Sequence, residues 1–268
     1  METIIIAVIS VTAIGAVCAA VLCAASKFMA VKVDERVVRI LECLPGTNCG
    51  ACGFPGCSAY AFELTSENGR NIKNNCTPGG AEVSKKINEI IGGDAGDSEF
   101  VKKVAVIRCA GNSDSQQKKM EYNGIKTCMA AKQIFSGERM CAFGCIGYAD
   151  CQVICPSDAV CMENGHAQII SHLCTGCALC VKACPNNLIT IEPENITVFV
   201  ACRNIEKPAV VRKKCSIGCL GCGKCVRECS ANAMMIKEYL AIIDYEKCTG
   251  CGHCAEICIT KCIHLQNQ

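Results

Sequence analysis

The sequence has no tryptophan and few other aromatic residues, with 7 Phe and 5 Tyr among 268 residues. Large side chains supply much of the apolar area that a protein core buries, so this fold must be stabilised in part by other means. Strong charge of one sign is also missing, because the formal net charge is only +2. This balance does not indicate the basic surface of a nucleic-acid-binding protein, and we expect no nucleic-acid partner.

Cysteine is the residue in excess, at 29 of 268 positions. One explanation is the disulfide framework of a secreted protein. The odd total and the clustering of the cysteines in short motifs argue against it. Metal binding is the other explanation, and metal–thiolate bonds would then contribute much of the folding energy. Thiolates suit both zinc and iron–sulfur clusters, so zinc is the alternative to an iron–sulfur centre.

Many of the cysteines recur with a period of 74 residues, since the run from Cys174 to Cys184 reappears from Cys248 to Cys258. The same step joins five further pairs, namely Cys128 and Cys202, Cys141 and Cys215, Cys145 and Cys219, Cys151 and Cys225, and Cys155 and Cys229. A fixed period of this kind indicates a tandem duplication. The sequence therefore predicts two related modules, residues 100–195 and residues 196–268.

The repeated spacing C-x2-C-x2-C-x3-C is that of bacterial two-cluster ferredoxins. Three cysteines of one run hold a [4Fe–4S] cluster, and the fourth ligates the other cluster. In the second module this pattern assigns Cys219, Cys222, Cys225 and Cys258 to one cluster and Cys229, Cys248, Cys251 and Cys254 to the other. In the first module it assigns one cluster to Cys155, Cys174, Cys177 and Cys180.

The remaining cluster of the first module departs from the pattern, because Tyr148 stands where the repeat has Cys222. We expect this cluster to be held by Cys141, Cys145, Cys151 and Cys184. Cys215, the repeat mate of Cys141, is then a surplus thiol or an alternative ligand. Cys128 and Cys202 also obey the repeat, and they are either buried thiols or further metal ligands.

The segment from Ile4 to Ala25 contains no charged side chain. As a helix it spans about 33 Å, which matches the thickness of a bilayer core. A cleaved signal peptide would have a basic start, whereas this chain begins Met-Glu-Thr. We therefore predict a single-pass transmembrane anchor over residues 1–27. Lys27, Lys32 and Arg36 follow it, which places the bulk of the chain on the cytoplasmic side of the cell inner membrane.

Residues 34–91 are predicted to form a separate single-cluster domain. An amphipathic stretch over residues 34–44 leads into the spacing C-x2-C-x4-C-x18-C, formed by Cys49, Cys52, Cys57 and Cys76. This spacing is not that of a ferredoxin, and a four-cysteine zinc site is its alternative. Residues 92–99 are rich in glycine and acidic residues and predict a linker.

Beyond the linker, residues 100–108 and 196–201 have the composition of strands. Short apolar stretches at residues 167–170 and 240–243 fit the hairpin strands of a ferredoxin fold. The predicted class is α+β, with an N-terminal transmembrane helix, a small [4Fe–4S] domain and tandem two-cluster ferredoxin-like modules.

This order of parts resembles the B subunit of the Rnf (or Rsx) complex, an ion-translocating ferredoxin:NAD+ oxidoreductase of bacterial membranes. The resemblance covers essentially the whole chain, and its most specific part is the motif from Pro45 to Cys57 behind an anchor. It implies cluster ligation by Cys49, Cys52, Cys57 and Cys76 and by the ferredoxin-spaced cysteines. The departures are Tyr148, and Ser230 and Ile259 where proline usually follows the last ligand.

The resemblance implies an electron-relay component of a translocase that carries about five [4Fe–4S] clusters. It would accept electrons from reduced ferredoxin and pass them to other subunits of the complex, with no catalytic side chain of its own. No dinucleotide-binding fingerprint is present, so we expect no direct NAD binding. The alternatives are a membrane-anchored polyferredoxin that serves another oxidoreductase, and a redox-sensing or structural metal-cluster protein.

Overall fold

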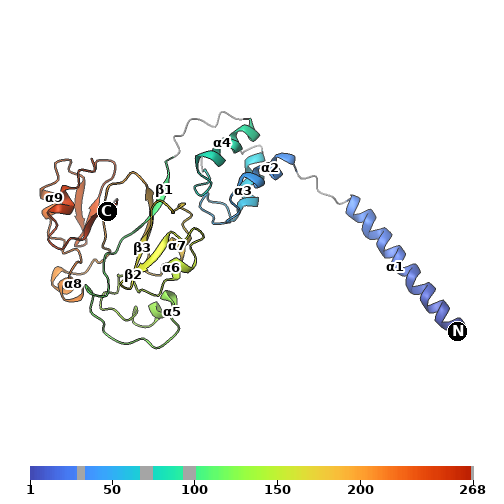
Figure 1. The fold of residues 1–268 in the computed structure, drawn as a ribbon, viewed down its shortest axis with the longest axis horizontal. Helices are drawn as coiled ribbons and strands as arrows, with labels where there is room; N and C mark the ends of the chain where they lie inside the picture. Colours follow the sequence, from blue (N-terminus) through green and yellow to red (C-terminus); the bar gives the residue numbers. More distant parts are fainter. Residues whose placement is uncertain (29–33, 67–74, 93–100, 267–268) are drawn as a thin grey trace.

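The computed structural model describes residues 1–28, 34–66, 75–92 and 101–266, which form both helices and strands (Figure 1). This confirms the predicted α+β class in its coarse form. Three separate apolar cores are present among these residues, around Ile40, Leu188 and Val198.

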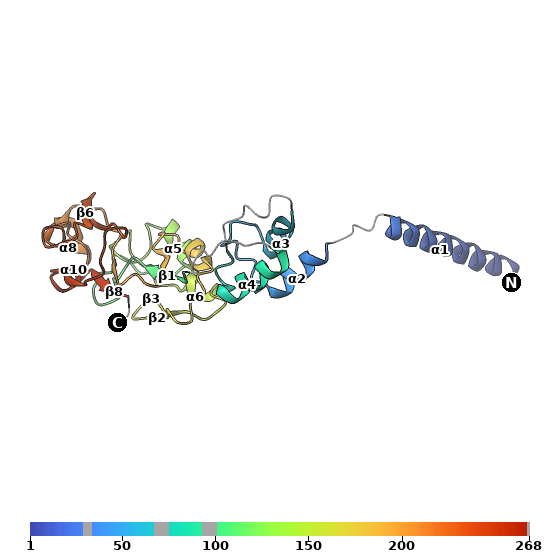
Figure 2. The same ribbon diagram turned by 90° about the horizontal axis from the view of Figure 1, so that it is seen from above.

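Helix α1 (Glu2–Phe28) covers the predicted apolar segment and lies apart from the remaining elements in both views (Figures 1 and 2). Its large apolar side chains, such as Val11, Val17 and Leu22, are exposed. By length and composition the helix can cross a membrane.

Helices α2 (Glu35–Cys43), α3 (Cys57–Thr65) and α4 (Gly80–Ile91) form a small helical unit. Asp34 caps α2, since its side chain accepts the N–H of Arg36 at 2.9 Å. Val37 and Ile40, the buried positions of α2, pack in one core with residues of α3 and α4. The predicted linker at residues 92–99 lies, apart from Gly92, outside the described residues.

Residues 101–195, here called the first α/β unit, contain β1 (Lys103–Ile107), α5 (Cys128–Gln133), α6 (Asp150–Val153), β2 (Val160–Glu163), β3 (His166–Ile169), α7 (Leu179–Ala183) and β4 (Ile189–Pro193). Strand β1 pairs antiparallel with β4, placing Val104 opposite Glu192, and β2 forms a hairpin with β3. Both strand pairs pack around one core that includes Val104 and Leu188.

Residues 196–266, the second α/β unit, contain β5 (Val198–Val200), α8 (Pro208–Lys214), α9 (Lys224–Arg227), β6 (Met234–Lys237), β7 (Leu240–Ile243), α10 (His253–Glu256) and β8 (Ile263–Leu265). The pairing is the same as in the first unit, because β5 joins β8 and β6 joins β7, both antiparallel.

The two units correspond through the 74-residue step only from Cys141 onward, where α6 maps onto α9 and β2 onto β6. Further upstream, Cys109 follows β1 as Cys202 follows β5. The thiol of Cys109 accepts the N–H of Cys145 at 3.4 Å, and the thiol of Cys202 accepts the N–H of Cys219 at 3.3 Å.

The structural partner of Cys202 is therefore Cys109, and the match of Cys202 to Cys128 by the 74-residue step was wrong. Cys109 and Cys145 are 36 positions apart, whereas Cys202 and Cys219 are 17 apart, so the first unit has 19 additional residues here. The longer stretch of the first unit includes α5, which begins at Cys128.

Candidate functional site

The cysteines of the helical unit lie around the start of α3 and form what we call the N-terminal group (Cys49, Cys52, Cys57 and Cys76). Cys49 and Cys76 are buried. Burial raises the pKa of Cys76, and negative charge on the other three sulfurs raises it further. The side chain of Asn48 shapes the loop, because its Oδ1 accepts the N–H of Cys57 at 2.8 Å.

In the first α/β unit, the loop before α7 carries Cys174 and Cys177, and α7 itself carries Cys180. Together with Cys155, which follows α6, they form the Cys177 group (Cys155, Cys174, Cys177 and Cys180). Burial is the main reason why the pKa of Cys180 rises to about 12, and the charges of the other three sulfurs contribute as well. The thiol of Cys174 accepts the N–H of Ala105 from β1 at 3.3 Å. The four thiols are thus drawn together from three parts of the unit.

In the second α/β unit, two cavities divide the predicted ligands as the ferredoxin pattern does. One is lined by the Cys225 group (Cys219, Cys222, Cys225 and Cys258), and the other by the Cys251 group (Cys229, Cys248, Cys251 and Cys254). Cys262 also lines the first cavity, with its Sγ 3.6 Å from the Sγ of Cys258. Sequence reasoning missed this neighbour, because Cys262 belongs to no cluster spacing.

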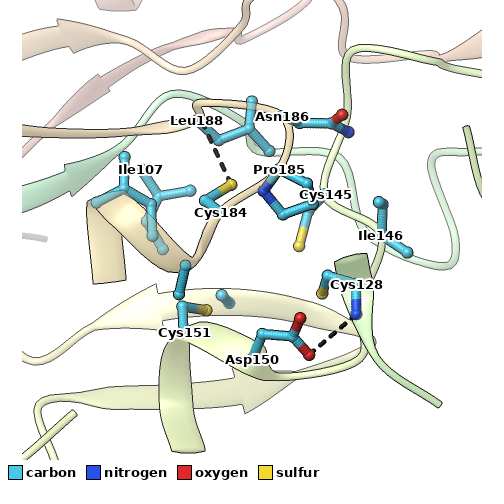
Figure 3. A pocket seen from close by; sticks show the side chains of 13 residues that line it. Ile107, Cys128, Cys145, Ile146, Asp150, Cys151, Cys184, Pro185, Asn186 and Leu188 are labelled. Atoms are coloured by element: carbon cyan, nitrogen blue, oxygen red, sulfur yellow. Dashed lines mark hydrogen bonds between the residues drawn. The ribbon is translucent and has the colours of Figure 1, made fainter. Parts of the chain in front are cut away.

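The irregular site of the first α/β unit is a cavity lined by the Cys151 group (Cys128, Cys145, Cys151 and Cys184), as Figure 3 shows. Cys128 opens α5, and its N–H donates to Oδ1 of Asp150 at 2.9 Å. Because Asp150 is also the first residue of α6, this bond holds Cys128 beside Cys151. Burial raises the pKa of Cys151 to about 12, and the charges of Cys145 and Cys128 add to the rise.

This arrangement differs in one thiol from the set expected from the sequence, which had Cys141 in place of Cys128. Cys141, itself among the described residues, is not part of the lining of this cavity. Its thiol instead accepts the amide Nδ2 of Asn204 at 3.5 Å. Tyr148 donates its hydroxyl to Glu138 and packs beside Tyr122. No local spacing indicates Cys128, because 16 residues separate it from Cys145.

The donor sets fit iron–sulfur clusters, because a [4Fe–4S] cluster is held by four cysteine thiolates and each of the five groups supplies four cysteines. A cubane cluster has its irons at separate corners, so its thiolates stand farther apart than the ligands of one ion. Within the described residues, no three Cys, His, Asp or Glu side chains converge as the ligands of a single metal ion would.

Three segments of the chain match protein-family models. Residues 44–78 match a family described as a putative Fe-S cluster. Residues 173–234 and 218–262 match two families, each described as a 4Fe-4S dicluster domain. The former of these two matches joins cysteines of the first α/β unit to cysteines of the second. The matches support several [4Fe–4S] clusters in this chain.

The chain is also similar to curated proteins over nearly its whole length. It is 39% identical over 240 residues to the B subunit of the Na+-translocating ferredoxin:NAD+ oxidoreductase complex of Acetobacterium woodii, covering 89% of this chain and 71% of the relative. It is 37% identical to the B subunit of an ion-translocating oxidoreductase complex of Methanosarcina acetivorans, and the match covers 99% of this chain and 100% of the relative. It is 36% identical to the B subunit of the proton-translocating ferredoxin:NAD+ oxidoreductase complex of Clostridium ljungdahlii, and this match covers 98% of this chain and 91% of the relative.

Proposed function

Because the chain belongs to the B-subunit family of Rnf-type ion-translocating oxidoreductase complexes, we propose that it accepts electrons from reduced ferredoxin and passes them to membrane subunits. The 4Fe-4S domain matches fit this relay role. [4Fe–4S] clusters supply one-electron transfer, and the protein sets their position, solvent exposure and hydrogen bonding.

Five clusters are assigned to the five thiol groups, with each α/β unit acting as a two-cluster ferredoxin-like module. The N-terminal, Cys177, Cys225 and Cys251 groups are those that the spacing predicts. The fifth is the Cys151 group, in which Cys128 replaces Cys141. Its support is the shared cavity and the bond between Cys128 and Asp150.

The observation that carries the relay proposal is the contact between the N-terminal group and the Cys177 group. Lys182 of α7 donates from Nζ to the carbonyl oxygen of Cys49 at 2.9 Å. Negative charge on Cys49 also contributes to the raised pKa of Cys177, after the larger effect of burial. Adjacent thiol groups of this kind are what electron transfer from the first α/β unit to the helical unit requires.

The direction of this route follows from α1. Its exposed apolar side chains and its length suit a single transmembrane anchor. The helical unit follows α1 in the chain, so its cluster is proposed to lie closest to membrane partners. The basic residues after α1 support a location of the α/β units on the cytoplasmic side of the inner membrane, which is where they would meet reduced ferredoxin.

The experiment compares Cys57→Ala with Cys43→Ala in membranes that hold equal amounts of the assembled complex. Cys57 belongs to the N-terminal group, whereas Cys43 is a half-buried thiol at the end of α2, outside that group. Cys57→Ala should abolish ferredoxin-driven NAD+ reduction, yet its remaining clusters should still be reduced by ferredoxin in electron paramagnetic resonance spectra. Cys43→Ala should behave as the unchanged protein.

Retained NAD+ reduction in a Cys57→Ala complex shown to lack the N-terminal cluster would exclude this route. Absence of any reduction of the chain by ferredoxin would exclude the relay function itself.

A further inference from the structure

Four cysteines outside the five thiol groups lie at the contact between the two α/β units. We call them the interface group, and they are Cys109, Cys141, Cys202 and Cys215. Cys109, Cys141 and Cys215 are each only 7% exposed, and Cys202 is partly buried. Each unit contributes two of them. They are equivalent in pairs, since Cys109 corresponds to Cys202 and Cys141 to Cys215.

Backbone and side-chain contacts between the two units hold these cysteines in position. The N–H of Ala110 donates to the carbonyl of Ala201 at 3.0 Å, which aligns the chain after β1 with the chain after β5. Gln116 forms an antiparallel bridge with Cys215. Arg108 also donates to the hydroxyl of Tyr245 across the interface at 3.1 Å. The interface group is therefore part of an ordered contact between the units.

Cys141 acts electrostatically on each of the other three members. Burial is the main reason for the raised pKa values of Cys109 (about 12), Cys202 (about 11) and Cys215. Negative charge on Cys145 raises the pKa of Cys109 further, and negative charge on Cys219 does so for Cys202. Negative charge on Cys141 adds a smaller rise to both and also raises the pKa of Cys215. Burial disfavours the thiolate form of Cys109, Cys202 and Cys215, and a bound cationic centre would reverse this preference.

Two buried amides point at these sulfurs. Asn204, 2% exposed, donates from Nδ2 to Sγ of Cys141 at 3.5 Å. Gln116, 5% exposed, has Nε2 at 3.9 Å from Sγ of Cys109, while its Oε1 is buried without a hydrogen-bond partner. Buried amides are costly unless they serve a partner, and N–H donors to sulfur stabilise cluster thiolates and tune their potential.

We propose that the interface group holds a further [4Fe–4S] cluster, bound by all four cysteines and shared between the two α/β units. Each thiol would lose its proton on ligation, and a cluster held there would supply one-electron transfer. The interface group touches the groups on both sides, because Cys109 accepts the N–H of Cys145 and Cys202 accepts that of Cys219. The cluster would thus connect the Cys151 and Cys225 groups. This relay role rests on the proposed function, whereas the binding of the cluster does not depend on it.

The test is a cluster count on the full-length chain, produced without oxygen and held in detergent. Non-denaturing mass spectrometry, with iron and sulfide analysis, should give about 24 irons per chain, four for each cube. A Cys141→Ala/Cys215→Ala double variant should retain about 20 irons. The matched control is Cys161→Ala, since Cys161 lies in β2 of the same unit outside every thiol group.

Two single variants, Cys109→Ala in the first unit and Cys202→Ala in the second, should each lose the same one cluster. They test the proposal even if the double variant does not fold. A count of about 20 irons in the unchanged chain overturns the proposal. So does an unchanged count in all these variants, or one zinc ion in place of the cluster. None of these measurements uses ferredoxin or NAD+, so failure here leaves the relay function standing.

Discussion

At the scale of the residue, a single carboxylate assembles the irregular site. Asp150 accepts the N–H of Cys128 at 2.9 Å and the N–H of Met129 at 3.1 Å, both at the start of α5. A carboxylate at a helix N-terminus satisfies free amide donors and stabilises the helix by about 1 kcal/mol. Here the carboxylate also holds Cys128, which belongs to the additional stretch of the first unit, next to Cys151.

Replacing this thiol tests the assignment of the Cys151 group. Cys128→Ala should lower the iron content by about four per chain, because one cube loses a ligand. Cys161→Ala should leave it unchanged. Iron and sulfide analysis of anaerobically purified protein is the measurement, and full iron content in Cys128→Ala would show that Cys128 is not a ligand.

A second substitution offers a rescue of the same site. The backbone of Tyr148 lies near the thiol of Cys128, because it acts to lower the pKa of Cys128 against the larger effect of burial. Tyr148 occupies the position of Cys222 in the repeat. In a Cys128→Ala background, Tyr148→Cys should therefore restore the missing cluster and its signal in electron paramagnetic resonance spectra. Failure to restore it, with the protein folded, would argue that Cys128 acts by packing instead of ligation.

At the scale of the element, the cysteine loops depend on glycines that pass close to a strand or hairpin. Gly221 has a φ of +58°, and a Cβ there would lie 2.5 Å from the carbonyl oxygen of Tyr239. Gly176, at φ +68°, would place a Cβ 2.4 Å from the carbonyl oxygen of Lys103. Only glycine combines this left-handed backbone with so close an approach, which holds the loop against the sheet.

Gly221→Ala should therefore destabilise the second α/β unit by about 1–3 kcal/mol, since both strain and a backbone clash oppose the new methyl group. Gly252→Ala is the matched control, because Gly252 has a φ of +78° but meets only a Leu265 side-chain atom, at 3.3 Å. The measurement is the guanidinium midpoint for loss of the cluster absorbance. A midpoint for Gly221→Ala at or above that of Gly252→Ala would contradict this account of the loop.

Helix α1 provides the other test at this scale. Its large apolar side chains are exposed, and its two cysteines, Cys18 and Cys23, are exposed and belong to no thiol group. Removal of residues 1–28 should yield a soluble, brown protein with the iron content of the full chain. The measurement is sedimentation from lysate together with iron analysis. A truncated protein that still pellets with membranes, or that is colourless when handled without oxygen, would show that α1 is more than an anchor.

At the scale of the whole molecule, the three apolar cores are built mainly from aliphatic side chains and cysteines. Among the described residues, the largest fully buried side chains include Ile40, Leu188 and Val104, and none of them is aromatic. Burial of such a side chain contributes about 1.5–3 kcal/mol, which leaves short strands and helices of four or five residues weakly supported. Cysteines of all five groups belong to these cores or pack against them, so metal–thiolate bonds and apolar packing would stabilise the same regions.

Removal of the clusters should therefore loosen both α/β units at once. We expect the chelator-treated chain, kept reduced, to lose most amide protection in β1 to β8 in hydrogen exchange, while α1 in detergent stays protected. The loaded chain is the control. Equal protection with and without iron would show that the apolar cores are sufficient for the fold.

Part of this arrangement follows from the sequence because it is local. The spacing C-x2-C-x2-C places Cys174, Cys177 and Cys180 on one loop, whatever surrounds it. An uncharged run of this length forms one long apolar helix, as α1 shows. The 74-residue period likewise predicts equivalent elements wherever the two units have equal numbers of residues, and α6 and α9 obey it.

Contacts between distant parts of the chain were decided only by the tertiary structure. Counting residues paired Cys128 with Cys202, but the pairing of β1 with β4 and of β5 with β8 makes Cys109 the counterpart of Cys202. The extra residues of the first unit carry Cys128 to the cavity of Cys151, and Cys141 turns to Asn204 of the other unit. A repeat period in the sequence shows which residues descend from the same ancestral position. The neighbours of a thiol depend instead on how strands and units pack, and residue spacing along the chain does not determine this packing.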